Sequence, residues 1–581
     1  MRHRSPLSLA ATALLLTSAA PPPLPPAQTL IREPLQPRSP VRCHTSVQPE
    51  VVRGTPRAKS YRLSRTPMPS VMAPPPPMPA PMAVPPPPGI VAQNNVVVTG
   101  RAIAPYGARE NTERYDGKPV ARIQDVASAP VSTFSVDVDT GSYANVRRFL
   151  TKGEPVPAEA VRTEELINYF RYDYPRPTSA GEPFSVTTDV ARTPWNGQTR
   201  LLRIGLRAYD VPTETRPPAN LVFLVDTSGS MSDDDKLPLV KRALEGLADN
   251  LRPADRVSIV AYAGSAGIVL DPTSNKDYVK QALTCLEAGG STAGGAGIDL
   301  AYATARANFV KNGINRIFLA TDGDFNVGVS DNKALEALVK RNRDDGITLT
   351  TLGFGQGNYN DAMMERIADV GNGNYGYIDS ASEARKVLED ELSATLVTVA
   401  KDVKVQVEFN PARVSQYRLI GYENRALNEE DFTNDAVDAG DMGAGHQVTA
   451  LYEVVPTGAA GWTPARRYDG NRAAAPASTG GELAFVKLRY KLPAGGPSRE
   501  LARAVPASAF AAAGAPSGDM AFATAVAAFG QRLRGDTYLG GYRFVDIRGL
   551  AGEPRGYWRQ QFVELTRLAD RGGRGTSGIG Q

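Results

Sequence analysis

Between residues 220 and 390 the chain alternates between two hydrophobic patterns. Short continuous apolar runs predict strands that are buried on both faces, and the first of these runs is 221–225. The next segment places Leu237, Val240, Leu244, Leu247 and Leu251 on one stripe, which is the period of an amphipathic helix. The later predicted strands are 257–261, 314–320, 347–354 and 375–378, and the later predicted helices are 277–286, 296–309, 331–342, 360–368 and 381–392. This order predicts an α/β domain with a doubly wound parallel sheet.

The segments on either side of this domain show other patterns. Before it, alternation at 133–138, 184–190 and 200–206 predicts strands, and 143–150 and 161–170 have helical spacing. After it, strict alternation at 403–409, 448–454 and 483–490 predicts an antiparallel sandwich, followed by helices at 520–533 and 557–569. We therefore predict a smaller α+β domain on the N-terminal side and a β-rich domain ending in helices on the C-terminal side.

These patterns, together with a composition that is 42% hydrophobic, divide the 581 residues into six segments. The predicted segments are a signal peptide (1–20), a Pro-rich basic linker (21–108), an α+β domain (109–210), the central α/β domain (211–398), a β-rich domain with terminal helices (399–572) and a disordered tail (573–581).

The first segment has the composition of a secretory signal peptide. Arg2 and Arg4 precede an apolar run at 7–20, which is too short to span a bilayer. An uncleaved anchor is the alternative. The residues before Cys43 are not small and apolar, so we do not expect a lipoprotein, and no later segment is apolar enough for a transmembrane helix. We expect a periplasmic or otherwise exported protein.

The linker cannot build a core, because about half of the 47 prolines precede Tyr106. It carries nine Lys and Arg residues against Glu33 and Glu50, so it could make weak contacts with anionic envelope surfaces. We expect it to be an extended spacer that folding does not require. The rest of the chain is mildly acidic, which argues against a nucleic-acid partner.

Cysteine and histidine are scarce. Three His and two Cys argue against zinc, haem and iron–sulfur centres, and against a disulfide scaffold. A bond between Cys43 and Cys285 would join a loose tail to a domain core, so we do not expect it.

Five oxygen-bearing residues lie where predicted strands end. Asp226-Thr-Ser-Gly-Ser230 follows the first buried strand, Thr292 lies in a Gly-rich turn, and Asp322 follows the strand at 314–320. Ligands bind at this edge of an open α/β sheet, so we expect Asp226, Ser228, Ser230, Thr292 and Asp322 to converge. Two carboxylates and three hydroxyls suit Mg²⁺ or Mn²⁺. Hydroxyls leave the metal much of its charge, so a carboxylate from another molecule could complete its shell. Ordinary strand-to-helix turns with capping Asp and Ser are the alternative.

These five residues match the metal-ion-dependent adhesion site (MIDAS) of von Willebrand factor A (VWA) domains. In addition, STFSVDVDTGSYANVRRFL at 132–150, RIFLATDGDFNVGVS at 316–330 and DVKVQVEFNP at 402–411 resemble the YfbK-type family of bacterial envelope proteins. The resemblance covers roughly residues 111–570. It implies an N-terminal region, a central VWA domain and a C-terminal domain, and it brings no established substrate.

Enzymatic readings find less support. Asp139-Thr-Gly-Ser resembles an aspartic-protease loop, but a second such motif is absent from the sequence, so we expect Asp139 to end a strand and cap the next helix. A phosphate-binding GxxxxGK[ST] motif is also absent, and we expect His446 at a strand start. A metal-dependent hydrolase would need a general base, for which Asp324 is the nearest candidate; we expect Asp324 to hydrogen-bond its own loop instead.

We therefore expect a non-enzymatic module that binds an acidic side chain of a protein partner through Mg²⁺ or Mn²⁺. The alternatives are the hydrolase, and an envelope protein in which the metal only stabilises loops.

Overall fold

The computed structural model describes residues 39–43, 112–292, 294–323, 332–391, 394, 396–437, 439–463 and 481–575. All described helices and strands lie in one compact unit, Pro40–Gln581. The predicted signal peptide, most of the predicted linker and Asp324 lie outside the described residues.

The central domain is built on a six-stranded sheet in the order β10-β9-β8-β5-β6-β7. All neighbouring strands are parallel except the edge strand β7, which is antiparallel to β6. The strands are β5 (Ala219–Asp226), β6 (Arg256–Tyr262), β7 (Ala266–Thr273), β8 (Ile314–Thr321), β9 (Thr348–Phe354) and β10 (Tyr375–Ile378). The predicted doubly wound α/β fold is confirmed, and β7 is the strand that the apolar pattern missed.

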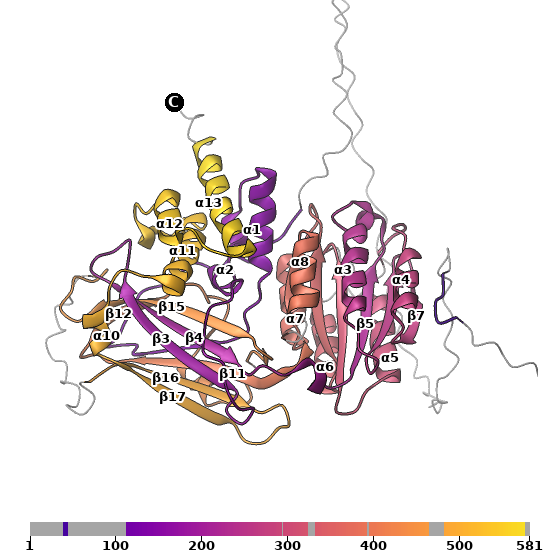
Figure 1. Cartoon of the computed structure of the whole chain (residues 1–581), viewed down its shortest axis with the longest axis horizontal. Coiled ribbons are helices and arrows are strands. Elements are labelled where there is room, and N and C mark those ends of the chain that lie inside the picture. Colours follow the sequence, from indigo (N-terminus) through magenta and orange to yellow (C-terminus); the bar gives the residue numbers. More distant parts are fainter. Residues whose placement is uncertain are drawn as a thin grey trace, which may run out of the picture. The chain divides into compact units, whose positions relative to one another are not determined.

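Helices cover both faces of this sheet (Figure 1). In β5, Leu221, Phe223 and Val225 face one layer, whereas Val222 and Leu224 face the other, as the alternation of a strand requires. The first layer contains α3 (Leu237–Asp249), α4 (Lys276–Thr284) and α8 (Ala381–Arg385), and the second contains α5 (Gly294–Ala307), α6 (Asn332–Asp344) and α7 (Asp361–Val370). Because β5 is buried on both faces, its carboxyl end is held rigidly.

The segments on either side of the central domain form one body, which we call the flanking body. We expected two domains, but strands from both segments pair within the same sheets: β2 lies beside β11, and β4 lies beside β15. One sheet contains β1 (Gln124–Asp125), β12 (Val414–Leu419), β15 (Gln447–Pro456), β4 (Arg200–Ala208) and β3 (Phe184–Arg192). The other contains β13 (Ala426–Leu427), β2 (Val131–Ser135), β11 (Thr398–Phe409), β16 (Glu482–Lys491) and β17 (Arg499–Pro506), with β14 (Met442–Gly443) paired to β11. The antiparallel sandwich therefore draws on both ends of the chain.

Helices from both segments also share an aromatic core. Tyr143 and Tyr169 stack, and Phe170 packs edge-on against Phe522 and Phe562. The helices of the flanking body are α1 (Gly141–Lys152), α2 (Thr163–Asn168), α10 (Ser508–Ala512), α11 (Gly518–Leu533), α12 (Phe544–Ala551) and α13 (Tyr557–Gly575). The last helix thus extends into the first residues of the predicted disordered tail. Within the described ranges, no helix combines the length and apolar character that a membrane span requires.

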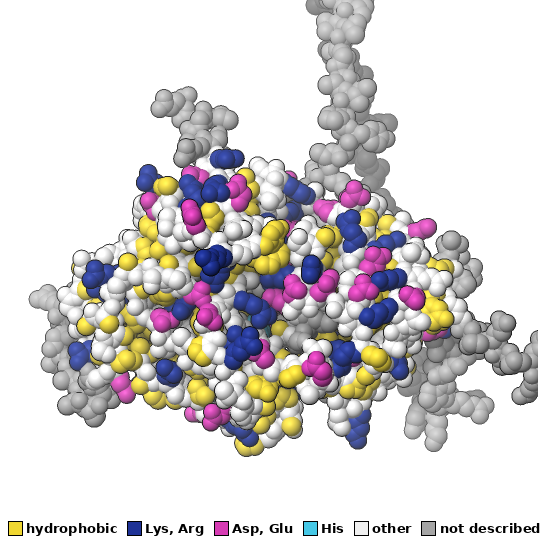
Figure 2. All heavy atoms as spheres, viewed as in Figure 1, with side chains coloured by type: hydrophobic (Ala, Val, Ile, Leu, Met, Phe, Trp, Pro, Cys, Tyr) yellow, Lys and Arg dark blue, Asp and Glu magenta, His cyan; other side chains and the backbone are white. Residues whose placement is uncertain are grey.

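Buried arginines of the flanking body bind carboxylates of the central domain. In α7, Asp361, Glu365 and Asp369 follow one another at four-residue spacing, which places them on one face of the helix. Arg162 pairs with Asp361 at 2.5 Å, and Arg425 pairs with Glu365 at 2.9 Å and with Asp369 at 2.8 Å. These pairs fix α7 against the flanking body. Figure 2 shows that on the outside, by contrast, acidic and basic side chains are interspersed over the face drawn.

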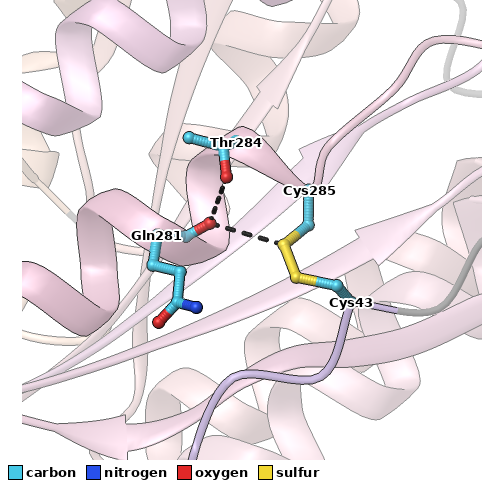
Figure 3. Close-up of a disulfide and its surroundings, with 4 residues drawn as sticks. All are labelled: Cys43, Gln281, Thr284 and Cys285. Carbon is cyan, nitrogen blue, oxygen red and sulfur yellow. Dashed lines mark hydrogen bonds between the residues drawn. A yellow bond between two sulfur atoms is a disulfide. The ribbon is translucent and has the colours of Figure 1, made fainter.

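A short segment of the predicted linker is anchored to the central domain, contrary to our expectation. Val41 bridges to Leu270 of the edge strand β7, and Arg42 forms an ion pair with Asp271 at 2.9 Å. Cys43 and Cys285 form a disulfide with a Cα–Cα distance of 5.3 Å (Figure 3). The expectation that Cys43 and Cys285 do not pair is wrong: local pattern carries no information on contacts between residues 242 positions apart.

Candidate metal centre

Asp226 is the last residue of β5 and is fully buried. Its Oδ1 accepts the backbone N–H of Ser228 at 2.9 Å. Its Oδ2 accepts the hydroxyls of Thr321 at 2.9 Å and Tyr262 at 3.1 Å. These donors come from β6, β8 and the turn after β5, so three parts of the sheet edge orient one carboxylate.

The two serines of the motif lie side by side. Ser228 Oγ and Ser230 Oγ are 3.0 Å apart; Ser228 is buried and Ser230 is half-buried. The turn that carries them is tied to the Gly-rich turn of Thr292, because Gly229 N–H donates to Gly290 O at 3.0 Å and Gly289 N–H donates to Thr227 O at 2.8 Å. The half-buried Thr292 follows two residues after Gly290, so the predicted convergence of these two turns is present at the backbone level.

Asp322 directly follows β8 and is fully buried. The next residue, Gly323, has a φ of +92°, and a Cβ there would lie 2.5 Å from Asn360 N, so only glycine allows this turn. Asp322 Oδ2 accepts a hydrogen bond from the Lys236 ammonium at 2.9 Å, and Lys236 is itself almost completely buried. Sequence reasoning missed Lys236. The sequence signal that could have indicated it is its position at the end of the acidic run 233–235, shortly after the serine motif.

The two carboxylates influence each other electrostatically. Burial raises the pKa of Asp226, and the negative charge of Asp322 raises it further, whereas the hydrogen bonds from Ser228 and Thr321 lower it. Of the two, Asp322 binds Lys236, which also lies 4.0 Å from the exposed Asp233.

The donor set fits a small divalent cation. In an octahedron with metal–oxygen distances near 2.1 Å, neighbouring ligand oxygens are about 3.0 Å apart. The Ser228 and Ser230 hydroxyls have this separation. With the carboxylates of Asp226 and Asp322 and the hydroxyl of Thr292, they would offer a hard-oxygen shell without soft ligands.

The rim of the site touches the flanking body. Lys236 Nζ also contacts Asn358 Oδ1 at 3.4 Å, and the neighbouring Gly357 N–H donates to Glu113 of the flanking body at 2.9 Å. Lys152, the last residue of α1, lies 3.6 Å from Asp235 in the acidic run beside the serine motif. The flanking body thus holds the two loops beside the candidate metal ligands.

Asp139 and His446, which the sequence analysis also singled out, have structural roles. Asp139 does not cap α1: its carboxylate accepts Tyr375 N–H at 2.8 Å and Arg425 at 3.1 Å. A Cβ at Gly141 would lie 2.3 Å from the Tyr375 ring, so the protease-like motif is a close contact between α1 and β10. His446 directly precedes β15, as expected, and burial lowers its pKa to about 4.

One further acidic group, formed by Asp139, Glu165 and Glu365, has oxygens within 4.8 Å of one another. Arg162 binds Glu165, and Arg425 binds Asp139 and Glu365. This group is therefore an ion-pair network at the junction of the two bodies.

Comparisons with known proteins agree with this organisation. Residues 220–391 match the von Willebrand factor type A domain, residues 109–203 match a family described as von Willebrand factor, and residues 394–571 match the family described as "Uncharacterized protein YfbK, C-terminal". The chain is 48% identical over 483 residues to the "Uncharacterized protein YfbK" of Escherichia coli K12, covering 81% of this chain and 83% of that protein. The chain belongs to the YfbK family. A more distant relative is the "Uncharacterized protein sll0103" of Synechocystis, 36% identical over 187 residues, which cover 32% of this chain and 43% of that protein.

Solved structures show remoter likeness. A von Willebrand factor type A protein from Catenulispora acidiphila is 16% identical, covers 68% of this chain and 91% of its own, and has a TM-score of 0.38. An aerotolerance-related membrane protein from Bacteroides fragilis is 25% identical over 30% of this chain and 98% of its own, with a TM-score of 0.26. The family assignment rests on the sequence matches.

Proposed function

We propose that the VWA domain binds Mg²⁺ or Mn²⁺ through Asp226, Ser228, Ser230, Thr292 and Asp322, and with it captures an acidic side chain of a protein partner. The observation that carries this proposal is the 3.0 Å separation of the Ser228 and Ser230 hydroxyls, beside two buried carboxylates at one sheet edge.

The charges favour an anionic group as the captured ligand. Lys236 binds Asp322 and also lies 4.0 Å from the exposed Asp233, and a divalent cation bound beside these groups would add two positive charges. A carboxylate of the partner would offset part of this charge. Hydroxyl ligands are neutral and leave the cation able to attract such a group, whereas water activation would need a general base. A partner could approach over Ser230 and Thr292, which are half-buried.

The flanking body would keep the site rigid for this role. Glu113 and Lys152 hold the loops beside the site, and the arginine pairs fix α7. Ligands held on a supported framework lose less freedom on binding, and the affinity rises accordingly. We infer an assembly or scaffolding module of the cell envelope, with no catalytic step of its own.

An exported location is part of the proposal. Disulfides persist in oxidising compartments such as the periplasm, and the Cys43–Cys285 bond suits such a place. The apolar run at 7–20 supports the same location.

A pull-down from envelope extracts tests this function. Wild type, the double variant Ser228→Ala/Ser230→Ala and the exposed control Ser232→Ala are compared, each with Mg²⁺ and with EDTA. We expect a protein that is retained by wild type and Ser232→Ala only with Mg²⁺. Replacement of its contacting Asp or Glu by Asn or Gln should then abolish binding of the purified pair.

Two results would favour the rivals. Metal-dependent hydrolysis of peptides or phosphoesters that is lost in the double variant would establish the hydrolase. If the partner binds equally well with Mg²⁺ and with EDTA, and equally well to wild type and to the double variant, the metal has a stabilising role only.

A further inference from the structure

Arg316 is a buried cation without a carboxylate partner among the described residues. It lies near the start of β8, and its side chain is 4% exposed. Nε donates to Thr348 Oγ1 at 3.0 Å, and Nη1 donates to Thr350 Oγ1 at 3.1 Å and to Asn374 Oδ1 at 3.4 Å. All three acceptors are neutral, and Nη2 has no partner in the described part of the chain.

This pairing is unusual for the molecule. Three other buried arginines, Arg147, Arg162 and Arg425, each bind two or more carboxylates. A buried charge without a counter-ion costs free energy. Burial accordingly lowers the pKa of Arg316 to about 10, and the charge of Asp441 opposes this only in part. A negative charge added beside Arg316 would therefore stabilise the fold.

Arg316 lines a cleft of about 950 Å³ between the central domain and the flanking body. Its walls come from α6, α7, β11 and the segment around Asp441. A cleft of this volume accepts a small organic molecule. It lies away from the candidate metal centre: none of Asp226, Ser228, Ser230, Thr292, Asp322 and Lys236 lines it.

Seven basic and seven acidic side chains line the cleft, but they are not all paired with one another. Most of its carboxylates already have a basic partner, as in the pairs of Glu336 with Arg366, Asp402 with Lys491 and Asp435 with Arg489. On the basic side, the exposed Lys340 and Lys401 also line the cleft. Like the buried Arg316, they have no described carboxylate within 4.0 Å.

We propose that this cleft binds a small oxyanion, a carboxylate or a phosphate group, with the Arg316 guanidinium as its anchor and Lys340 and Lys401 at the mouth. A guanidinium presents its N–H groups in a fork that fits both oxyanions, and the neutral Thr348, Thr350 and Asn374 hold it in place without competing for the charge.

Calorimetric titration of the full chain, in chloride buffer without divalent metal, tests this site with inorganic phosphate and with succinate as separate probes. The variants are Arg316→Gln, the double variant Lys340→Gln/Lys401→Gln, and the control Arg366→Gln. The control removes a cleft charge that already has a partner, Glu336, at 3.1 Å. Thermal unfolding with and without each probe is measured in parallel.

We expect at least one probe to bind wild type and raise its Tm, and the stronger probe identifies the group. Arg316→Gln should weaken binding at least tenfold while its Tm without probe stays at or above that of wild type, because a buried unpaired charge is removed. The Lys340/Lys401 variant should weaken binding severalfold, and Arg366→Gln less than twofold.

Failure of both probes to bind wild type would overturn the proposal, as would equal affinity in wild type and Arg316→Gln. If Arg316→Gln does not fold, the Lys340/Lys401 variant decides, since its residues are exposed: unchanged affinity there would also contradict the site.

Discussion

The ammonium of Lys236 lies 2.9 Å from Asp322 Oδ2, and both side chains are almost completely buried. A cation of the protein therefore already neutralises one of the two carboxylates proposed to bind a metal. Lys236 and a divalent cation would compete for the same negative charge.

Lys236→Met should therefore raise the affinity for Mg²⁺ by about tenfold, equivalent to about 1.4 kcal/mol. Without metal, the same variant should melt at a lower temperature than wild type, because Asp322 loses its buried partner, and Mg²⁺ should restore the melting temperature. Lys241→Met, which removes the same charge further along α3, is the control for both measurements. Weaker Mg²⁺ binding in Lys236→Met would show that Lys236 supports the site instead of competing with it.

Arg425 holds the central domain to the flanking body. Arg425→Met would leave the buried Asp139 and the half-buried Glu365 and Asp369 without this partner, so we expect a loss of about 3 kcal/mol in the free energy of unfolding. Arg366→Met, on α7, breaks an exposed pair with Glu336 and should cost less than about 1 kcal/mol. Urea unfolding of both variants gives the comparison, and equal losses would refute the special role of the junction.

Glu164 should make the stability of the fold depend on pH. Burial raises its pKa to about 7, and the charges of Glu423 and Glu165 act in the same direction. Between roughly pH 4.5 and 7 the folded chain keeps this proton while the unfolded chain loses it, so the free energy of unfolding falls as pH rises through this window.

Glu164→Gln removes this effect. The variant should match wild type near pH 4.5 and be more stable at pH 8, by on the order of 3 kcal/mol. Chemical unfolding of both proteins at the two pH values provides the test. If the free energies of unfolding of the two proteins differ by the same amount at both pH values, Glu164 does not titrate in this range.

The Cys43–Cys285 bond closes a loop of 242 residues, so reduction should lower the free energy of unfolding by up to about 5 kcal/mol. A reductant should lower the Tm of wild type but not that of Cys43→Ser. Arg42→Ala, which removes only a partly exposed ion pair, should cost less than about 1 kcal/mol. A Tm of wild type that is insensitive to reductant would contradict the anchoring of this segment.

Local pattern predicted the parts of the molecule that depend on nearby residues. The apolar run of β5 and the stripe of α3 predicted both elements, and strand ends predicted where Asp226 and Asp322 would lie. The edge strand β7 was missed because most of its residues are half-buried and its apolar run, Ile268–Leu270, is short and is followed by Asp271 and Pro272.

Contacts between residues far apart in the sequence could not be predicted from local pattern. The register of β2 with β11 joins residues about 270 positions apart, and Lys236 meets Asp322 across 86 positions. Cys43 and Cys285 pair across 242 positions. The acidic spacing at Asp361, Glu365 and Asp369 was visible, but its partners Arg162 and Arg425 lie in segments that were expected to form two other domains.

Calorimetric titration of Mg²⁺ into metal-free wild type and Asp226→Ala tests the metal centre most directly. Asp226 orients the shell from the end of β5, and its removal takes away one of the two carboxylates. We expect about one ion per chain in wild type and none in the variant, which should remain folded by circular dichroism. Equal Mg²⁺ binding by wild type and a folded Asp226→Ala would contradict the assignment of the site.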